Sequence, residues 1–167
     1  MIARGLLACR KRPLVVVLDQ VRSGYNVGAA FRSSDAFGVE HLYLCGITSK
    51  PPHPQIEKSA LGATQYVNWS HHPKTLPLLE KLKKAGYQLL AIEQSPKSIS
   101  LQSFVGYPDR SPYCFIFGHE LYGVSKTVLE AADQVIEIPQ FGKKKSLNVA
   151  TCIGIVLWEL SKEVVIA

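Results

Sequence analysis

The sequence lacks the features that mark several common protein classes. Its uninterrupted apolar stretches, such as Leu14–Leu18, are far shorter than the roughly 20 residues that a membrane-spanning helix needs. No apolar segment of signal-peptide length follows the basic residues near the N-terminus, so we expect a cytoplasmic protein without membrane attachment. The 167 residues are 47% hydrophobic and 19% charged, which predicts a folded domain rather than a disordered or coiled-coil chain.

Metal-binding and nucleotide-binding signatures are also missing. The four cysteines form no Cys-x-x-Cys pair, and the five histidines show no ligand spacing, so we expect no metal site. Neither the Gly-x-Gly-x-x-Gly motif nor the Walker A motif occurs, which argues against ordinary NAD or ATP binding. A nucleotide-dependent oxidoreductase is disfavoured for the same reason.

Acidic residues are scarce where basic residues gather. The net charge is +6, and the first twelve residues carry four basic side chains and no acidic one. A second basic cluster is Lys143–Lys145. This balance favours a polyanionic partner, although each cluster alone also fits a solvated segment. We expect a basic arm at residues 1–12 and a single domain at residues 13–167.

Strand and helix patterns alternate along the whole chain. The predicted strands are Leu14–Asp19, His41–Cys45, Tyr66–Trp69, Tyr87–Glu93, Tyr113–Phe117 and Val135–Ile138. The predicted helices are Val27–Phe37, Lys74–Ala85, Ser125–Ala132 and Leu147–Val164. This alternation predicts an α/β domain, with a mostly parallel sheet that has helices on both faces.

Local signals refine these helices and one loop. We expect Asn26 to cap the first helix, Gly38 to end it, and Gly86 to end the second. The last helix shows an apolar stripe from Val149 onward. The proline-rich stretch 48–54 is expected to be a surface flap or a binding loop.

Three strand-to-helix junctions are unusually polar, at residues 19–28, 117–123 and 138–148. Ligands of α/β proteins gather where strands end and helices begin, so these junctions are candidate binding segments. Their distinctive residues, in chain order, are Asn26, Gly28, Arg32 and Gly38, then Gly118, Glu120 and Gly123, then Ile138-Pro139 and Ser146-Leu147-Asn148.

Taken together, these residues resemble the three motifs of the SpoU (TrmH-type) branch of the SPOUT RNA methyltransferases. The resemblance extends over residues 14–164 and implies a C-terminal trefoil knot, a homodimer whose active site draws on both subunits, and a minimal member with only the catalytic domain. It implies methyl transfer from S-adenosylmethionine to a ribose 2′-hydroxyl in tRNA or rRNA. One departure is Gln140, where many relatives have Met after Ile-Pro.

The resemblance also assigns a cofactor site. Gly118 would allow close approach of the backbone to the cofactor, while Ile138 and Leu147 would wall its adenine. The segment after the predicted strand 87–93 would form the remaining edge. The residues expected to bind the cofactor are Ile92, Glu93, Gln94, Gly118, Ile138, Gln140 and Leu147.

The catalytic set implied by the resemblance is Arg32, Asn26, Glu120, Ser146 and Asn148. The residue that matches Arg32 is held in the family to activate the ribose hydroxyl. Because the pKa of a guanidinium is too high for a base, we prefer a bidentate clamp on the adjacent phosphate. Asn26 would orient Arg32 or the substrate, and Glu120 would pair with a basic or backbone donor.

The expected RNA contacts are Arg22, Arg32, Lys143, Lys144 and Lys145. The three lysines directly precede the Ser-Leu-Asn motif, where RNA must approach the cofactor. An alternative remains open at this point: an RNA-binding or assembly module with the same fold and little or no turnover. The intact motif residues speak against that alternative.

Overall fold

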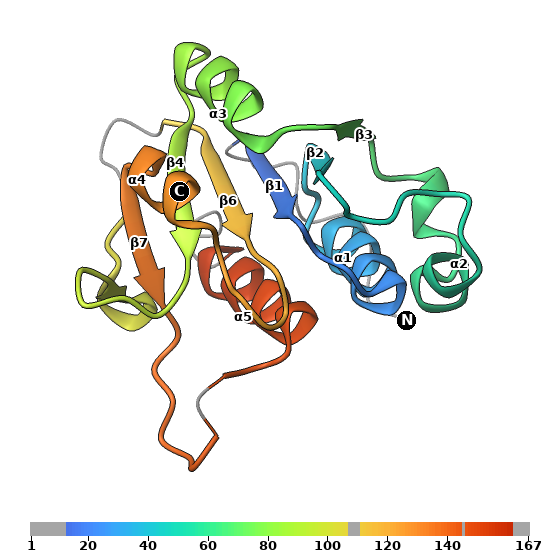
Figure 1. Ribbon diagram of the computed structural model, residues 1–167. Coiled ribbons are helices and arrows are strands. Elements are labelled where there is room, and N and C mark those ends of the chain that lie inside the picture. The colour runs from blue at the N-terminus through green and yellow to red at the C-terminus, as the bar shows by residue number, and fades with distance from the viewer. Residues whose placement is uncertain (1–12, 107–110, 145, 162–167) are drawn as a thin grey trace, which may run out of the picture.

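The computed structural model describes residues 13–106, 111–144 and 146–161, so the predicted basic arm and Lys145 lie outside the described residues. The described residues form a seven-stranded sheet of order β3-β2-β1-β6-β4-β7-β5, in which every neighbouring pair is parallel (Figure 1). The strands are β1 (Leu14–Asp19), β2 (His41–Cys45), β3 (Trp69–His72), β4 (Gln88–Ile92), β5 (Ile99–Ser100), β6 (Tyr113–Phe117) and β7 (Gln134–Glu137).

Helices cover both faces of this sheet. The α-helices are α1 (Gly24–Ala36), α2 (Pro54–Ala60), α3 (Thr75–Lys84), α4 (Lys126–Ala131) and α5 (Val149–Ser161). One core joins α1, α2 and α5 to the sheet, and a second core joins α3 and α4 to its other face. Strand β1 supplies both cores, because Val16 and Leu18 point to the first while Val15 and Val17 point to the second. The predicted α/β class with a parallel sheet is confirmed, and the knot stays a prediction.

The predicted strands agree with the structure best at the centre of the sheet. Strands β1, β2 and β6 have the predicted bounds, and β1 and β6 are buried along almost their whole length. The prediction of a strand at Tyr66–Trp69 is wrong, because β3 begins at Trp69 and a 3₁₀ turn occupies Ala63–Gln65. Tyr66 itself is 77% exposed, which shows that its aromatic ring is not part of a buried strand.

The prediction that Asn26 caps α1 is also wrong. The helix begins at Gly24, and its cap is Ser23, whose hydroxyl accepts a hydrogen bond from the backbone N–H of Asn26 at 3.4 Å. Asn26 therefore lies in the first turn, which frees its side chain for other contacts. Gly38 and Gly86 end α1 and α3 with positive φ angles of 63° and 90°, as predicted.

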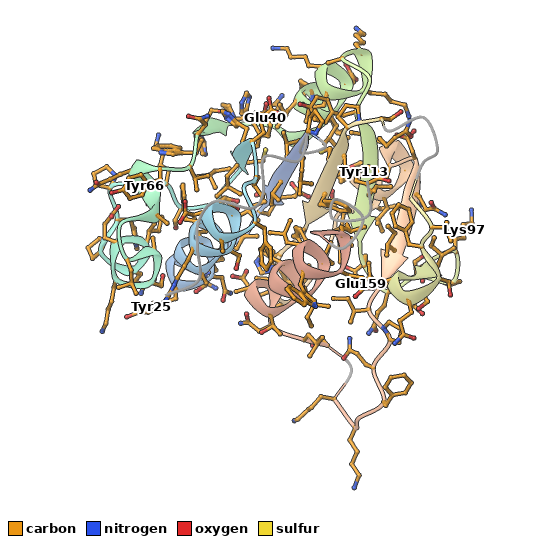
Figure 2. All side chains as sticks on the ribbon, turned by 180° about the vertical axis from the view of Figure 1, so that it is seen from behind. Tyr25, Glu40, Tyr66, Lys97, Tyr113 and Glu159 are labelled. Atoms are coloured by element: carbon orange, nitrogen blue, oxygen red, sulfur yellow. The ribbon has the colours of Figure 1, made fainter. Side chains whose placement is uncertain are left out.

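The proline-rich stretch leads into a helix that the sequence patterns did not predict. Pro54 occupies the first turn of α2, and His53 caps it by accepting a hydrogen bond from the backbone N–H of Gln55 at 3.2 Å. Helix α2 lies beside α1 at one end of the molecule (Figure 1), whereas Lys97 marks the opposite end (Figure 2). The loop from β7 to α5 extends below the sheet in Figure 1.

Helix α5 confirms the predicted apolar stripe. Val149, Ile153, Val156 and Leu160 are buried against the first core. The part of the predicted helix beyond Ser161 lies outside the described residues. None of the helices in the described part of the chain is long and apolar enough to cross a membrane.

Candidate active site

A cavity of about 450 Å³ lies where β4, β6 and β7 end and α5 begins. Its lining brings together all seven predicted cofactor-binding residues: Ile92, Glu93, Gln94, Gly118, Ile138, Gln140 and Leu147. Three members of the predicted catalytic set, Glu120, Ser146 and Asn148, line the same cavity. Residues far apart in the sequence therefore meet because the parallel strands end at one edge.

Gly118 shows why the segment after β6 requires glycine. A Cβ atom at this position would overlap the backbone of Gly123 and Val124. The two ends of the segment are joined by hydrogen bonds between His119 and Gly123, in which each backbone N–H donates to the other's carbonyl, at 3.0 and 2.8 Å. The chain thus folds back tightly and presents backbone to the cavity, which is the close approach that an adenine or similar ring needs.

Glu93 fastens this segment to the end of β4. One carboxylate oxygen of Glu93 accepts from the backbone N–H of Gln94 at 2.8 Å, and the other from that of Val124 at 2.9 Å. A Cβ atom at Gly123, which has a φ of +66°, would collide with the same carboxylate. Glu93 therefore sets the distance between two walls of the cavity.

Glu120 fastens the cavity to the start of α1. Its carboxylate accepts hydrogen bonds from the backbone N–H of Arg22 at 3.0 Å and of Ser23 at 2.8 Å, and from Nδ2 of Asn26 at 2.9 Å. Partial burial by itself raises the pKa of this carboxyl, but the hydrogen bonds from Arg22, Ser23 and Asn26 outweigh it and lower the pKa below its ordinary value. Glu120 is thus held as a carboxylate that organises backbone.

Asn148 extends this network to α5. Its Nδ2 donates to Oδ1 of Asn26 at 3.1 Å, while its own Oδ1 accepts from the backbone N–H of Ala150 at 2.9 Å and of Thr151 at 3.4 Å. Asn148 therefore caps α5 and links it to α1 at the same time. The chain Glu120–Asn26–Asn148 connects all three polar junctions of the sequence.

The predicted RNA-contacting cations within the described residues are exposed, and none of them lines the cavity. Arg32 does not line the cavity but a second hollow of about 550 Å³ between α1 and α2, here called the α1–α2 hollow. The side chains of Arg22, Lys143 and Lys144 are exposed, and Lys145 lies outside the described residues. No residue in the described part of the chain forms a salt bridge with Arg32.

Some lining residues were missed by sequence reasoning. His119, Tyr122 and Cys152 line the cavity, and the rings of His119 and Tyr122 lie 4.8 Å apart. Burial raises the pKa of the Cys152 thiol, which keeps it protonated and unreactive. His119 and Tyr122 stand inside a recognised motif and could have been found there, whereas Lys58 of the α1–α2 hollow lies on the helix that was not predicted.

Comparison with known proteins decides the family. Residues 13–158 match the SpoU rRNA Methylase family. The chain belongs to that family. This SpoU-family protein is 32% identical over 160 residues to a tRNA (guanosine(18)-2′-O)-methyltransferase of Aquifex aeolicus, covering 96% of this chain and 74% of the relative.

Two solved structures share the fold of this SpoU-family protein. The TrmH/SpoU tRNA modifying enzyme of A. aeolicus superposes with a TM-score of 0.81 at 30% identity, covering 93% of this chain and 77% of that one. An AdoMet-bound rRNA methyltransferase from Sinorhizobium meliloti superposes with a TM-score of 0.85 at 24% identity, covering 95% of this chain. This chain spans 59% of the S. meliloti protein.

The cavity suits a ligand of the size and chemistry of S-adenosylmethionine. Its volume of about 450 Å³ falls in the usual range for small-molecule sites. Apolar side chains of Ile92, Ile138 and Leu147 can flank an aromatic ring, while the backbone around Gly118 leaves no room for a side chain. No group of three metal-ligating side chains lies together among the described residues.

Proposed function

We propose that this protein is an S-adenosylmethionine-dependent methyltransferase that methylates a ribose 2′-hydroxyl in tRNA or rRNA. The observation that carries the proposal is the cavity around Gly118. Two motif segments line it, and hydrogen bonds from Asn26 to Glu120 and from Asn148 to Asn26 join the third segment to them. The names of its relatives support the same reaction and the same class of substrate. We further propose that the protein acts in the cytoplasm.

The cofactor is held by the residues that line the cavity. Ile138 and Leu147 would flank its adenine, the backbone around Gly118 would supply close contacts, and Glu93 with Gln94 would close the side toward β4. Bound in this way, S-adenosylmethionine supplies an electrophilic methyl carbon. The ribose oxygen would take that methyl group, the electron pair of the broken carbon–sulfur bond would stay on the departing thioether, and the hydroxyl proton would pass to water.

Arg32 stabilises the attacking oxygen by clamping the neighbouring phosphate. A guanidinium cannot accept the hydroxyl proton near neutral pH, but its planar fork can hold a phosphate and lower the pKa of the adjacent hydroxyl. Ser146 lines the cavity, where its hydroxyl would hydrogen-bond the ribose. Asn26 and Glu120 order the start of α1, the helix that carries Arg32, so they position the clamp.

A homodimer brings Arg32 to the reaction. Within one chain Arg32 lines the α1–α2 hollow and not the cofactor cavity, so an active site that draws on two copies explains the separation. Exposed Trp158 on α5, whose ring meets Phe37 just beyond α1, gives that end of the molecule an apolar surface for such a partner.

Cofactor binding and transfer test the proposal. Calorimetry should detect S-adenosylmethionine binding, and a labelled methyl group should then appear in bulk tRNA or bulk rRNA from a strain that lacks the enzyme. Nucleotide-resolution mapping of that RNA identifies the modified ribose. Cofactor binding without transfer to any RNA would favour the alternative, an RNA-binding or assembly module without turnover.

A further inference from the structure

The α1–α2 hollow carries two cations and no acid. Arg32 on α1 and Lys58 on α2 are both exposed, and the lining described for the hollow contains no Asp or Glu. The acid of α2, Glu57, does not line the hollow and accepts a hydrogen bond from the hydroxyl of Thr64 at 3.1 Å. Neither cation forms a salt bridge with a residue in the described part of the chain. The hollow therefore favours an anion.

Close helix packing fixes the spacing of the two cations. A Cβ atom at Gly28 of α1 would overlap the side chain of Ser59 and the carbonyl of Ile56 on α2. The hydroxyl of Ser59 lies 3.0 Å from the carbonyl oxygen of Tyr25, so it joins α2 to the first turn of α1. Because the two backbones touch, Arg32 and Lys58 project from a rigid pair of helices.

The rest of the hollow is less polar. Ala29 and Ala36 form its wall on α1, and Leu61 follows α2 in a left-handed conformation with a φ of +49°. The volume of about 550 Å³ is large enough for a nucleotide. A charged pair beside an apolar wall matches a nucleotide, whose phosphate is anionic and whose sugar and base present less polar faces.

We propose that the α1–α2 hollow holds one nucleotide of the RNA substrate, with its phosphate between Arg32 and Lys58 and its sugar against the alanine wall. The inference rests on the proposed function and adds Lys58 as an RNA-binding residue. Lys58 then shares a phosphate with the clamp that acts on the ribose. Its contribution is to hold RNA in register, whereas Arg32 also acts on the reacting oxygen.

The test compares Lys58→Gln with Lys84→Gln, an exposed lysine of α3 on the opposite face of the sheet. Binding of bulk tRNA and bulk rRNA is measured at several salt concentrations, together with cofactor affinity. We expect Lys58→Gln to weaken RNA binding by about two- to fivefold, the range of an exposed charge pair. Its salt slope should fall by about 0.7, the value for one phosphate contact on a single strand. The cofactor affinity of Lys58→Gln should match that of the parent. The RNA binding and the cofactor affinity of Lys84→Gln should also match those of the parent.

A double-mutant cycle sharpens the test. If Arg32 and Lys58 hold one phosphate, the combined Arg32→Ala and Lys58→Gln variant should bind RNA more tightly than the sum of the single losses predicts. The pair Arg32→Ala and Lys84→Gln should be additive. Lys58→Arg should restore the affinity and the salt slope of the parent.

Other results would overturn the inference in distinguishable ways. A parent that binds and methylates RNA while Lys58→Gln retains its RNA affinity and salt slope would leave the proposed function standing and remove Lys58 from RNA binding. A Lys58→Gln variant that is monomeric in sedimentation, while the parent is dimeric, would assign Lys58 to the contact between two copies and not to RNA. A parent that binds neither RNA fraction would overturn both proposals.

Discussion

The cofactor cavity and the α1–α2 hollow are built in different ways. The cavity is held by hydrogen bonds that Glu93 and Glu120 accept and that Asn148 donates, and these bonds join segments far apart in the sequence. The hollow lies between two neighbouring helices, and its cations project on long, exposed side chains. A fixed cavity suits a small molecule of constant shape, whereas solvent-exposed cations suit the phosphates of a polymer.

The largest expected effect comes from adding a side chain at Gly118, where the backbone lines the cavity. Gly118→Val should abolish detectable cofactor binding, because the new side chain would overlap Gly123 and Val124. Overpacking of this kind costs about 1–3 kcal/mol of stability, so circular dichroism should still show the fold. Calorimetry measures the affinity, and Gly154→Ala is the control, since a Cβ there meets nothing within 4 Å. Parent-like affinity in the valine variant would show that the cofactor binds elsewhere.

Replacing Arg32, the proposed phosphate clamp, should affect methyl transfer and leave cofactor binding unchanged. Arg32→Ala should retain cofactor affinity but lose about 10²- to 10³-fold in transfer rate, as expected when a donor that stabilises developing charge is lost. Arg32→Lys should fall between parent and alanine, because it keeps the charge without the planar fork. Single-turnover rates on a verified RNA measure the effect. Parent-like rates from the alanine variant would remove Arg32 from the reaction.

The pH profile of the Arg32→Lys variant distinguishes a clamp from a base. Lysine at this position titrates near its ordinary pKa of about 10.4. A phosphate clamp loses its charge there, so the rate of Arg32→Lys should fall as the pH approaches that value. A rate that instead rises with deprotonation would mean that residue 32 accepts the proton.

An intermediate effect is expected where the two regions are joined. Glu120→Gln removes a carboxylate that accepts three hydrogen bonds at the start of α1, at a cost of about 1 kcal/mol after allowing for partial exposure. Because the folded state lowers the pKa of Glu120 below its ordinary value of 4.5, its stabilising effect is complete above that pH and is lost as the pH falls through the folded pKa.

Urea unfolding at pH values from 7 down to 3 measures this effect. Parent and Glu120→Gln should differ at pH 7 and converge in acid, and Glu130→Gln, from an exposed pair with Lys126, serves as the control. A difference that stays constant over the whole range would exclude ionisation of Glu120 as its source.

The smallest effect is expected from the exposed lysines beside the cavity. Replacing Lys143 and Lys144 by Gln should lower the salt slope of RNA binding by about 1.4, equivalent to two phosphate contacts on a single strand. Cofactor affinity should not change, because neither lysine lines the cavity. Filter binding at several salt concentrations measures the slope. An unchanged slope would assign both lysines to solvated surface.

The central strands could be predicted because burial on both faces leaves a continuous apolar run, as in Val15–Leu18 and Phe115–Phe117. Helix α2 was missed because its seven residues are too few to show a helical period, and its cap is a histidine. The start of α1 was misplaced because Ser23 and Asn26 are both good caps, and only the hydrogen-bond geometry distinguishes them.

The cavity residues could be predicted because their motifs occupy short, ordered segments of sequence. The separation of Arg32 from that cavity could not, since it depends on where α1 lies relative to β4 and β7. The role of Glu120 in ordering the start of α1 could be recognised only in the structure. Its partners are the backbone N–H groups of Arg22 and Ser23, which have no sequence signature.

The placement of β6 between β1 and β4 has a consequence for synthesis on the ribosome. Strand β4 pairs only with β6 and β7, and both of these emerge from the ribosome after it. The nascent chain can therefore assemble β1, β2 and β3 early. The apolar residues of β4 have no neighbouring strand until β6, residues 113–117, has been synthesised. The hydrogen bond from Asn148 to Asn26 comes last and spans 122 positions. The cofactor pocket can therefore form only after Asn148 and the start of α5 have left the ribosome.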